Sequence, residues 1–188
     1  MKKKNGTYVD HGFGFPIKIE NLPLELDESL EKAEWIPDMD LSLLQADLFE
    51  KLITYEGNLT GNHIRFIRLH LGLTLEKFGV FAGGFTHQAV MKWEKNRENP
   101  AGMDWHNELN LRLQMALTLD MKPDRLKSVC VNLVNKSKHG TPTITLDAST
   151  VAVYAAEVSR LMRCRTTDKD DGTAPAAPRG QHELSLAA

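Results

Sequence analysis

Cysteine is scarce in this sequence, and metal-binding spacings are missing. The 188 residues include only Cys130 and Cys164, with no Cys-x-x-Cys pair. None of the seven histidines follows a His-x-x-x-His or His-Glu-x-x-His spacing. A disulfide framework is therefore excluded, and a zinc site has no support. We expect two reduced thiols, no bound metal and no cofactor.

Long apolar runs are also missing. No run approaches the ~20 residues that cross a bilayer, and the charged start, MKKKNG, is not followed by the apolar stretch of a signal peptide. We therefore expect a cytoplasmic protein with no membrane partner. There is also no Ser/His/Asp or Cys/His arrangement and no glycine-rich phosphate loop after a strand. We expect no enzymatic activity.

The charge is unevenly distributed along the chain. The net charge is −2, which by itself argues against a nucleic-acid partner. Residues 1–59, however, contain six Lys and Arg against twelve Asp and Glu, whereas residues 60–98 contain six against three. Residues 99–188 are nearly balanced, with eleven against ten. An acidic N-terminal part is thus followed by a small basic module.

Residues 8–26 show the alternation of a strand. Apolar and polar residues alternate at Ile17, Ile19, Leu22 and Leu24, and glycines and prolines flank or interrupt the run. This pattern predicts short edge strands or a hairpin. From Asp40 to Tyr55 the apolar spacing changes to that of a helix, with Asp38 or Asp40 as the N-cap.

Three short helices follow within fewer than 40 residues. The first begins after Thr60 and ends at Gly72, the second begins after Thr74 and ends at Gly83-Gly84, and the third begins after Thr86 and continues through residue 94. Threonine is a favoured N-cap, and glycine favours the left-handed conformation that ends a helix. Since a tight glycine turn joins the second and third helices, we expect a helix-turn-helix. A fourth helix is predicted over residues 104–120.

The remainder of the chain has weaker patterns. Helices are predicted for residues 123–136 and 149–163, with a short strand at TPTITL between them. Residues 166–188 are rich in Ala, Pro, Gly and charge, which predicts disorder. The expected fold is mainly α: a Cro/repressor-like helix-turn-helix bundle with a small β-containing N-terminal segment and a C-terminal helical extension. The expected parts are an acidic segment (1–57), a DNA-binding domain (58–122), a helical extension that could serve dimerisation (123–165) and a tail (166–188).

The third helix has the asymmetry of a DNA recognition helix. Ala89, Val90 and Trp93 form its apolar face, and His87, Gln88, Met91 and Lys92 lie opposite. Such a helix can present its first turn to base edges in the major groove.

Each of these outward residues suits a particular contact with DNA. Gln88 could pair with adenine N6 and N7, Lys92 could reach guanine or phosphate, and Met91 or the Thr86 methyl could touch a thymine methyl. Asn96 and Arg97 follow in a loop suited to phosphate. The start of the second helix, at Thr74, offers a further phosphate site.

Each residue also has an ordinary alternative. Solvated polar residues are common on surface helices, which applies to His87, Gln88 and Lys92. Met91 could be an exposed apolar residue or a dimer contact, and Arg97 could pair with Glu98 or Glu94. The DNA interpretation therefore depends on the combination of two helices punctuated by glycine, outward polar residues and positive local charge.

The segment LTGNHIRFIRLHLGLTLEKFGVFAGGFTHQAVMKWEKNRENP resembles the Cro/repressor-type (XRE) helix-turn-helix. More narrowly, it is similar to the DNA-binding half of MqsA/YgiT-type antitoxins. The resemblance implies base-facing roles for Thr86, His87, Gln88, Met91 and Lys92, and phosphate contacts for Asn96 and Arg97. It also implies a structural pair between Arg68 and Glu94, with Trp93 in the core. The family's N-terminal zinc cysteines are missing here, so zinc binding is not implied.

These observations predict a sequence-specific, dimeric DNA-binding regulator that represses its own operon, encoded by a bacterium or phage. The operator would be palindromic double-stranded DNA, with half-sites about one helical turn, ~34 Å, apart or a multiple of it. Helices 104–120 and 149–163 are the candidate dimer surfaces. Within this hypothesis the acidic residues 20–50 could mask a basic RNase-type toxin, as in a toxin-antitoxin system. The alternative is a protein-interaction adaptor or toxin-neutralising protein in which the helix-turn-helix is scaffold.

Overall fold

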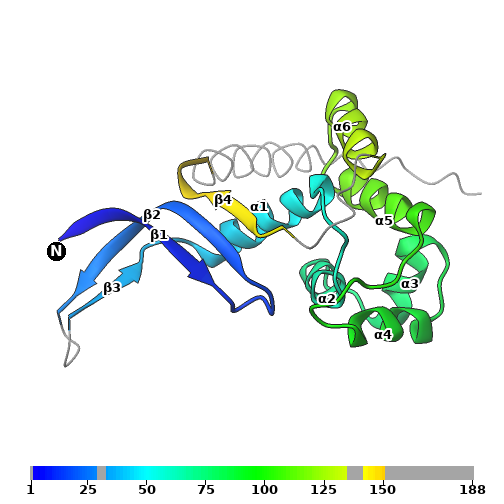
Figure 1. The fold of residues 1–188 in the computed structure, drawn as a ribbon, viewed down its shortest axis with the longest axis horizontal. Helices are drawn as coiled ribbons and strands as arrows, with labels where there is room; N and C mark the ends of the chain where they lie inside the picture. The colour runs from blue at the N-terminus through cyan, green and yellow to red at the C-terminus, as the bar shows by residue number, and fades with distance from the viewer. Residues whose placement is uncertain (1, 29–32, 135–141, 151–188) are drawn as a thin grey trace, which may run out of the picture. The chain divides into compact units, whose positions relative to one another are not determined.

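The computed structural model describes residues 2–28, 33–134 and 142–150 (Figure 1). Nearly all of the helix predicted for residues 149–163, the tail predicted for residues 166–188 and Cys164 lie outside the described residues. Within them, Cys130 is an exposed thiol.

The expectation of a mainly α fold is wrong. A four-stranded mixed sheet accompanies the helices, so the fold is α/β. The strands are β1 (Lys3–Asp10), β2 (Ile17–Asp27), β3 (Glu34–Pro37) and β4 (Ile144–Asp147). The helices are α1 (Leu41–Thr54), α2 (Gly61–His70), α3 (Leu75–Gly83), α4 (His87–Lys95), α5 (Trp105–Thr118) and α6 (Pro123–Val134).

The long strand β2 organises the sheet. β1 pairs antiparallel with it as a hairpin, with Asp10 opposite Ile17 and Lys3 opposite Glu25. On its other side β2 pairs first with β4, which is parallel, and then with β3, which is antiparallel. The strand at TPTITL and the hairpin alternative for residues 8–26 are confirmed, although β1 begins earlier, at Lys3. The alternative of short edge strands is wrong, because β2 is an eleven-residue strand paired on both sides. The sequence patterns did not predict that these strands form one sheet.

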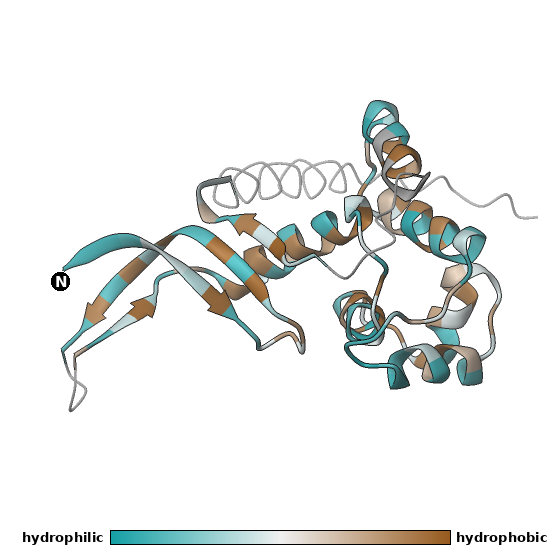
Figure 2. Cartoon of the chain, in the orientation of Figure 1, coloured by the Kyte–Doolittle hydropathy of each residue, from teal (hydrophilic) through white to brown (hydrophobic). Residues whose placement is uncertain are grey.

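Alternation along β2 places one face of the sheet in the core. Ile17, Ile19, Leu22 and Leu24 are all buried, and Figure 2 shows hydrophobic and hydrophilic residues alternating along this strand. Successive strand residues point to opposite faces of a sheet, so only one set of β2 side chains faces the core. Side chains of β4 and α1 complete this part of the core. These side chains are Ile144, Leu146, Leu44, Leu48, Phe49, Leu52 and Ile53.

Helix α1 carries a buried carboxylate. Asp40 caps the helix by accepting a hydrogen bond from the Ser42 N–H, whereas the buried Oδ2 of Asp47 has no hydrogen-bond partner among the described residues. Burial raises the pKa of Asp47, Glu50 raises it further, and Lys51 opposes the shift. The charged form is therefore disfavoured in the folded state.

Replacing Asp47 with asparagine should stabilise the protein by about 1 kcal/mol at pH 7, because an amide is less costly to bury than a charged carboxylate. A raised folded-state pKa means that folding binds protons, so the cost of Asp47 appears as pH rises above the unfolded-state value. The advantage of asparagine should accordingly shrink toward pH 3. Urea unfolding at both pH values tests this, with the exposed Asp124→Asn as control. A variant that is less stable than the native protein at pH 7 would contradict the assignment.

The helix caps after residue 59 are confirmed. Thr60, Thr74 and Thr86 each accept a hydrogen bond from the backbone N–H three residues later. Gly84, in the left-handed conformation, ends α3. Since each cap stabilises its helix by about 1 kcal/mol, local sequence alone defines where α2, α3 and α4 begin.

The turn between α3 and α4 lies directly on α3. A Cβ atom at Gly79 would stand 2.1 Å from the Phe85 carbonyl oxygen, so no other residue fits without moving the backbone. The Phe85 N–H also donates to the Gly79 carbonyl at 2.8 Å. This close approach fixes the direction of α4 relative to α3.

Candidate nucleic-acid interface

Helix α4 is held in the helical part of the fold by its apolar side. Val90 is fully buried and Trp93 nearly so. The ring of Phe85, from the preceding turn, meets Trp93 edge-on with 5.0 Å between ring centroids. Ala89 is partly buried on the same side. Because these residues face inward, the opposite side of α4 points to solvent.

The outward side of α4 carries the predicted base-facing residues. His87, Gln88, Met91 and Lys92 are all exposed, with 54% of Met91 accessible. None of the four side chains makes a hydrogen bond or ion pair with any residue that the structure describes. Their polar groups are therefore available to an external partner, as the helical spacing predicts.

The two threonine side chains in the predicted interface have structural roles. The Thr86 hydroxyl accepts from the Ala89 N–H at 3.3 Å, and the Thr74 hydroxyl accepts from the Lys77 N–H at 3.2 Å. The contact between the Thr86 methyl and a thymine methyl stays a prediction, since a methyl contact needs no hydrogen bond. At Thr74 an acidic residue, Glu76, lies in the first helical turn and would oppose a phosphate there.

The two predicted phosphate contacts in the loop after α4 have different roles. The Asn96 amide donates to the carbonyls of Pro100 and Ala101, at 3.1 and 2.9 Å, so its donors already bind within the loop. Arg97 is exposed and has a φ of 50°. Its carbonyl accepts from the Asn62 N–H at 2.8 Å, which fixes its backbone while the guanidinium remains in solvent.

The pair that the family resemblance implies is present. Arg68 and Glu94 form two parallel hydrogen bonds, Nε to Oε1 at 2.6 Å and Nη2 to Oε2 at 3.1 Å. Arg68 also donates to the Leu73 carbonyl at 3.1 Å. The pair ties α2 to the end of α4 and to the segment before α3. Because Glu94 is held by Arg68, it is not the partner of Arg97.

Close backbone packing joins α2 to α4, a contact that the helical patterns of the sequence do not predict. A Cβ atom at Gly61 would stand 2.5 Å from the Arg97 nitrogen and 2.6 Å from the Trp93 carbonyl oxygen. The Gly61 N–H donates to the Asn99 carbonyl at 3.2 Å. A glycine directly after the Thr60 N-cap was the available signal, since glycine permits such an approach.

A buried arginine ties α5 to the end of α1. Arg112 is fully buried, and its Nη2 meets Glu108 Oε1 at 2.7 Å. The same guanidinium donates to the carbonyls of Ile53, Tyr55 and Gly57. Glu108 and Arg112 lie four residues apart on α5. This spacing is visible in the sequence, but the apolar pattern of the helix did not predict that the pair is buried. This network therefore joins α5 to the segment that follows α1.

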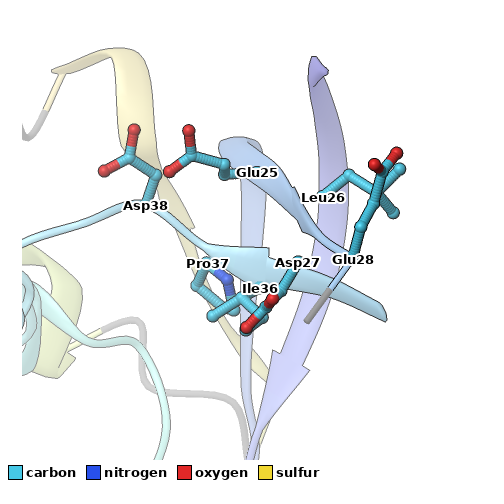
Figure 3. Close-up of a pocket in the computed structure, with 7 residues that line it drawn as sticks. All are labelled: Glu25, Leu26, Asp27, Glu28, Ile36, Pro37 and Asp38. Carbon is cyan, nitrogen blue, oxygen red and sulfur yellow. The ribbon is translucent and has the colours of Figure 1, made fainter. Parts of the chain in front are cut away.

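A separate acidic hollow lies at the ends of β2 and β3. It has a volume of about 400 Å³, and Figure 3 shows Glu25 and Asp38 on one side of it and Asp27 with Ile36 on another. Asp38 accepts a hydrogen bond from Lys3 at 3.0 Å. The adjoining Trp35 is 36% exposed. This surface combines negative charge with exposed apolar groups.

The described residues contain no group of His, Cys, Asp or Glu arranged to hold a metal ion. Within the same residues, no helix combines the length and the apolar character needed to cross a membrane. No family model matches the sequence, and no similar chain was found among the curated proteins or the solved structures.

Proposed function

We propose that the chain is a sequence-specific DNA-binding regulator in which α4 enters the major groove. The observation that carries the proposal is the outward side of α4, where His87, Gln88, Met91 and Lys92 are exposed and make no hydrogen bond or ion pair with the described residues, while Val90 and Trp93 anchor the helix. A recognition helix needs both properties, since base readout depends on a fixed backbone and on polar side chains that reach the groove.

The residues divide into base and backbone contacts. Gln88 presents an amide that matches adenine N6 and N7, and Lys92, one turn later, reaches guanine or phosphate. Arg97 contacts phosphate from a loop with a fixed backbone. Asn96 positions that loop through the carbonyls it binds, and we assign it no phosphate.

The proposed regulator acts as a dimer on a palindromic operator, because one short helix covers too little DNA for useful specificity. Helix α5 offers a dimer surface, since Trp105 and Leu117 are 42% and 64% exposed. Under the same proposal, the chain is encoded by a bacterium or a phage and represses its own operon in the bacterial cytoplasm.

A second candidate function concerns the acidic hollow. The four carboxylates that line the hollow, Glu25, Asp27, Glu28 and Asp38, outnumber the two lysines that pair with them, Lys2 and Lys3, which favours a basic protein partner, since complementary potentials steer association. A toxin would make the chain an antitoxin. With such a partner and no DNA binding, the chain would be an adaptor whose helix-turn-helix is scaffold. Sequence-blind DNA binding, or none, would favour the adaptor.

Replacing Gln88 with alanine should weaken binding to the operator by about 1–3 kcal/mol and relax preference at one base pair. Replacing Arg97 with alanine should instead weaken binding to every sequence alike and lower the salt slope by about 1. Fluorescence anisotropy with the chain's own upstream DNA and with random DNA, at two salt concentrations, measures both effects.

Gln45→Ala on α1 is the matched control, since it removes the same amide away from α4 and from the proposed dimer surface on α5. If Gln88→Ala and Arg97→Ala act equally on specific and random DNA, Gln88 does not read a base. Absence of any preference for the upstream DNA in the native protein would overturn the proposed function.

A further inference from the structure

A groove with no assigned role lies between the β1–β2 loop, α1 and α2. Its volume is about 500 Å³, and its lining includes Phe13, Gln45, Asn62, Arg65 and Leu69. Small-molecule sites in proteins commonly occupy about 300–1,000 Å³ and combine apolar walls with a few polar groups. The groove has the size and composition of such a site.

The walls of the groove are held in place without a ligand. Phe13 from the loop meets Phe66 of α2 edge-on, with ring centroids 5.5 Å apart. The Asn62 side chain donates to the Gly14 carbonyl, and Phe15 packs against the His63 ring at 4.3 Å. Since aromatic and hydrogen-bonded contacts both join the loop to α2, the groove is preformed.

Arg65 gives the groove a positive charge. Its side chain is exposed and makes no ion pair with any described residue, and the described residues that line the groove include no Asp or Glu. The guanidinium of arginine remains charged at all physiological pH values and binds carboxylates through two parallel hydrogen bonds. An anion is therefore the natural ligand for this end of the groove.

The rest of the groove lining favours a ligand with a flat apolar ring. Leu69 is 57% exposed although it borders the groove. The His70 ring stacks on Phe49 and Phe66, at centroid distances of 4.6 and 5.8 Å, and burial lowers its pKa. Among the described lining residues Arg65 is therefore the permanent cation, which favours a single negative charge on the ligand.

We propose that this groove binds a small aromatic carboxylate. Arg65 pairs with the carboxylate, and the ring lies against Phe13 and Leu69. The amide of Gln45 lines the opposite wall, on α1.

The groove is connected to the proposed DNA contacts through one residue. The backbone N–H of Asn62, a lining residue, donates to the Arg97 carbonyl at 2.8 Å. A ligand that displaces the first turn of α2 would therefore move the loop that carries Arg97. This regulatory consequence rests on the proposed function, whereas ligand binding itself does not.

Isothermal titration of the full chain with benzoate, benzamide and acetate tests the binding site. Benzoate should bind saturably, and benzamide, which lacks the charge, and acetate, which lacks the ring, should bind at least tenfold more weakly. Arg65→Gln should weaken benzoate binding at least tenfold, whereas Lys95→Gln, which removes an exposed cation outside the groove, should leave it unchanged. Leu69→Ala should weaken benzoate more than acetate.

Two results would overturn the site: no saturable binding of benzoate, or equal binding by the native protein and Arg65→Gln. Circular dichroism of each variant checks that it is folded. DNA anisotropy with and without saturating benzoate then tests the coupling. A chain that binds benzoate but not DNA would refute the proposed function alone, and a chain that binds DNA but not benzoate would refute the groove alone.

Discussion

Replacing Arg112 with methionine is expected to lower the free energy of unfolding by about 3–5 kcal/mol. Arg112 is fully buried and Glu108 nearly so. Methionine would fill much of the volume but leave the Glu108 carboxylate without its cation, and the carbonyls of Ile53, Tyr55 and Gly57 would lose their donor. A single unpaired buried charge costs more than the whole pair contributes.

Urea unfolding followed by circular dichroism measures this cost. Arg65→Met, an exposed arginine replaced in the same way, should change stability by no more than about 0.5 kcal/mol. The double variant Arg112→Met with Glu108→Leu should recover part of the loss, because it also removes the buried carboxylate that Arg112 neutralises. A loss below about 1 kcal/mol for Arg112→Met alone would show that the buried pair does not hold α5 to α1.

The parts of the fold that could be predicted from the sequence are those that local contacts decide. Thr60, Thr74 and Thr86 cap their helices through hydrogen bonds only three residues long, so the sequence shows both partners. The hairpin was also predictable, because Ile17 and Ile19 alternate with polar residues toward a single buried face.

The sheet as a whole could not be predicted because its partners are distant or lack a pattern. β4 pairs with β2 across more than 120 residues, as Ile144 meets Ile17. The four residues of β3, beginning at Glu34, are all exposed and show no alternation of burial. β1 is exposed along almost all its length. Helical patterns therefore dominated the sequence, and the mainly α expectation followed.

The candidate interface likewise has features that could be predicted from the sequence and features that could not. The outward positions of Gln88 and Lys92 follow from the 3.6-residue period of a helix anchored by Val90 and Trp93. The use of Asn96 could not be predicted, since its acceptors are carbonyls presented by the turn at Pro100 and Ala101. Arg112 was missed for a related reason: hydrophobic periodicity gives no weight to a charged residue on a buried face.

Acidification should destabilise the protein through His63. This ring is 4% exposed, and its Nδ1 accepts a hydrogen bond from the Thr60 N–H at 3.2 Å, which requires that nitrogen to be unprotonated. Burial lowers the pKa of His63 to about 3, and the charge of Arg112 contributes. The unfolded chain therefore binds a proton near pH 6.5 that the folded state refuses, and stability falls as pH drops below that value. The loss is about 2 kcal/mol at pH 5 and about 4 kcal/mol at pH 3.

Urea unfolding at pH 7.5, 6 and 5 measures this loss, and His63→Gln separates it from other titrations. Glutamine can still accept from the Thr60 N–H, as it does in an ordinary capping box, but it cannot be protonated. The variant should be less stable than the native protein at pH 7.5, because the contacts of the imidazole with Phe15 and Tyr55 are lost, yet its stability should depend much less on pH. His11→Gln, which replaces an exposed histidine, should keep the native slope. Equal slopes for the native protein and His63→Gln would mean that the imidazole is protonated in the folded state as readily as in the unfolded chain. The N-terminus of α2 could not then keep its cap, and the Gly61 and Asn62 N–H groups that hold the loop of Arg97 and Asn99 would be arranged differently.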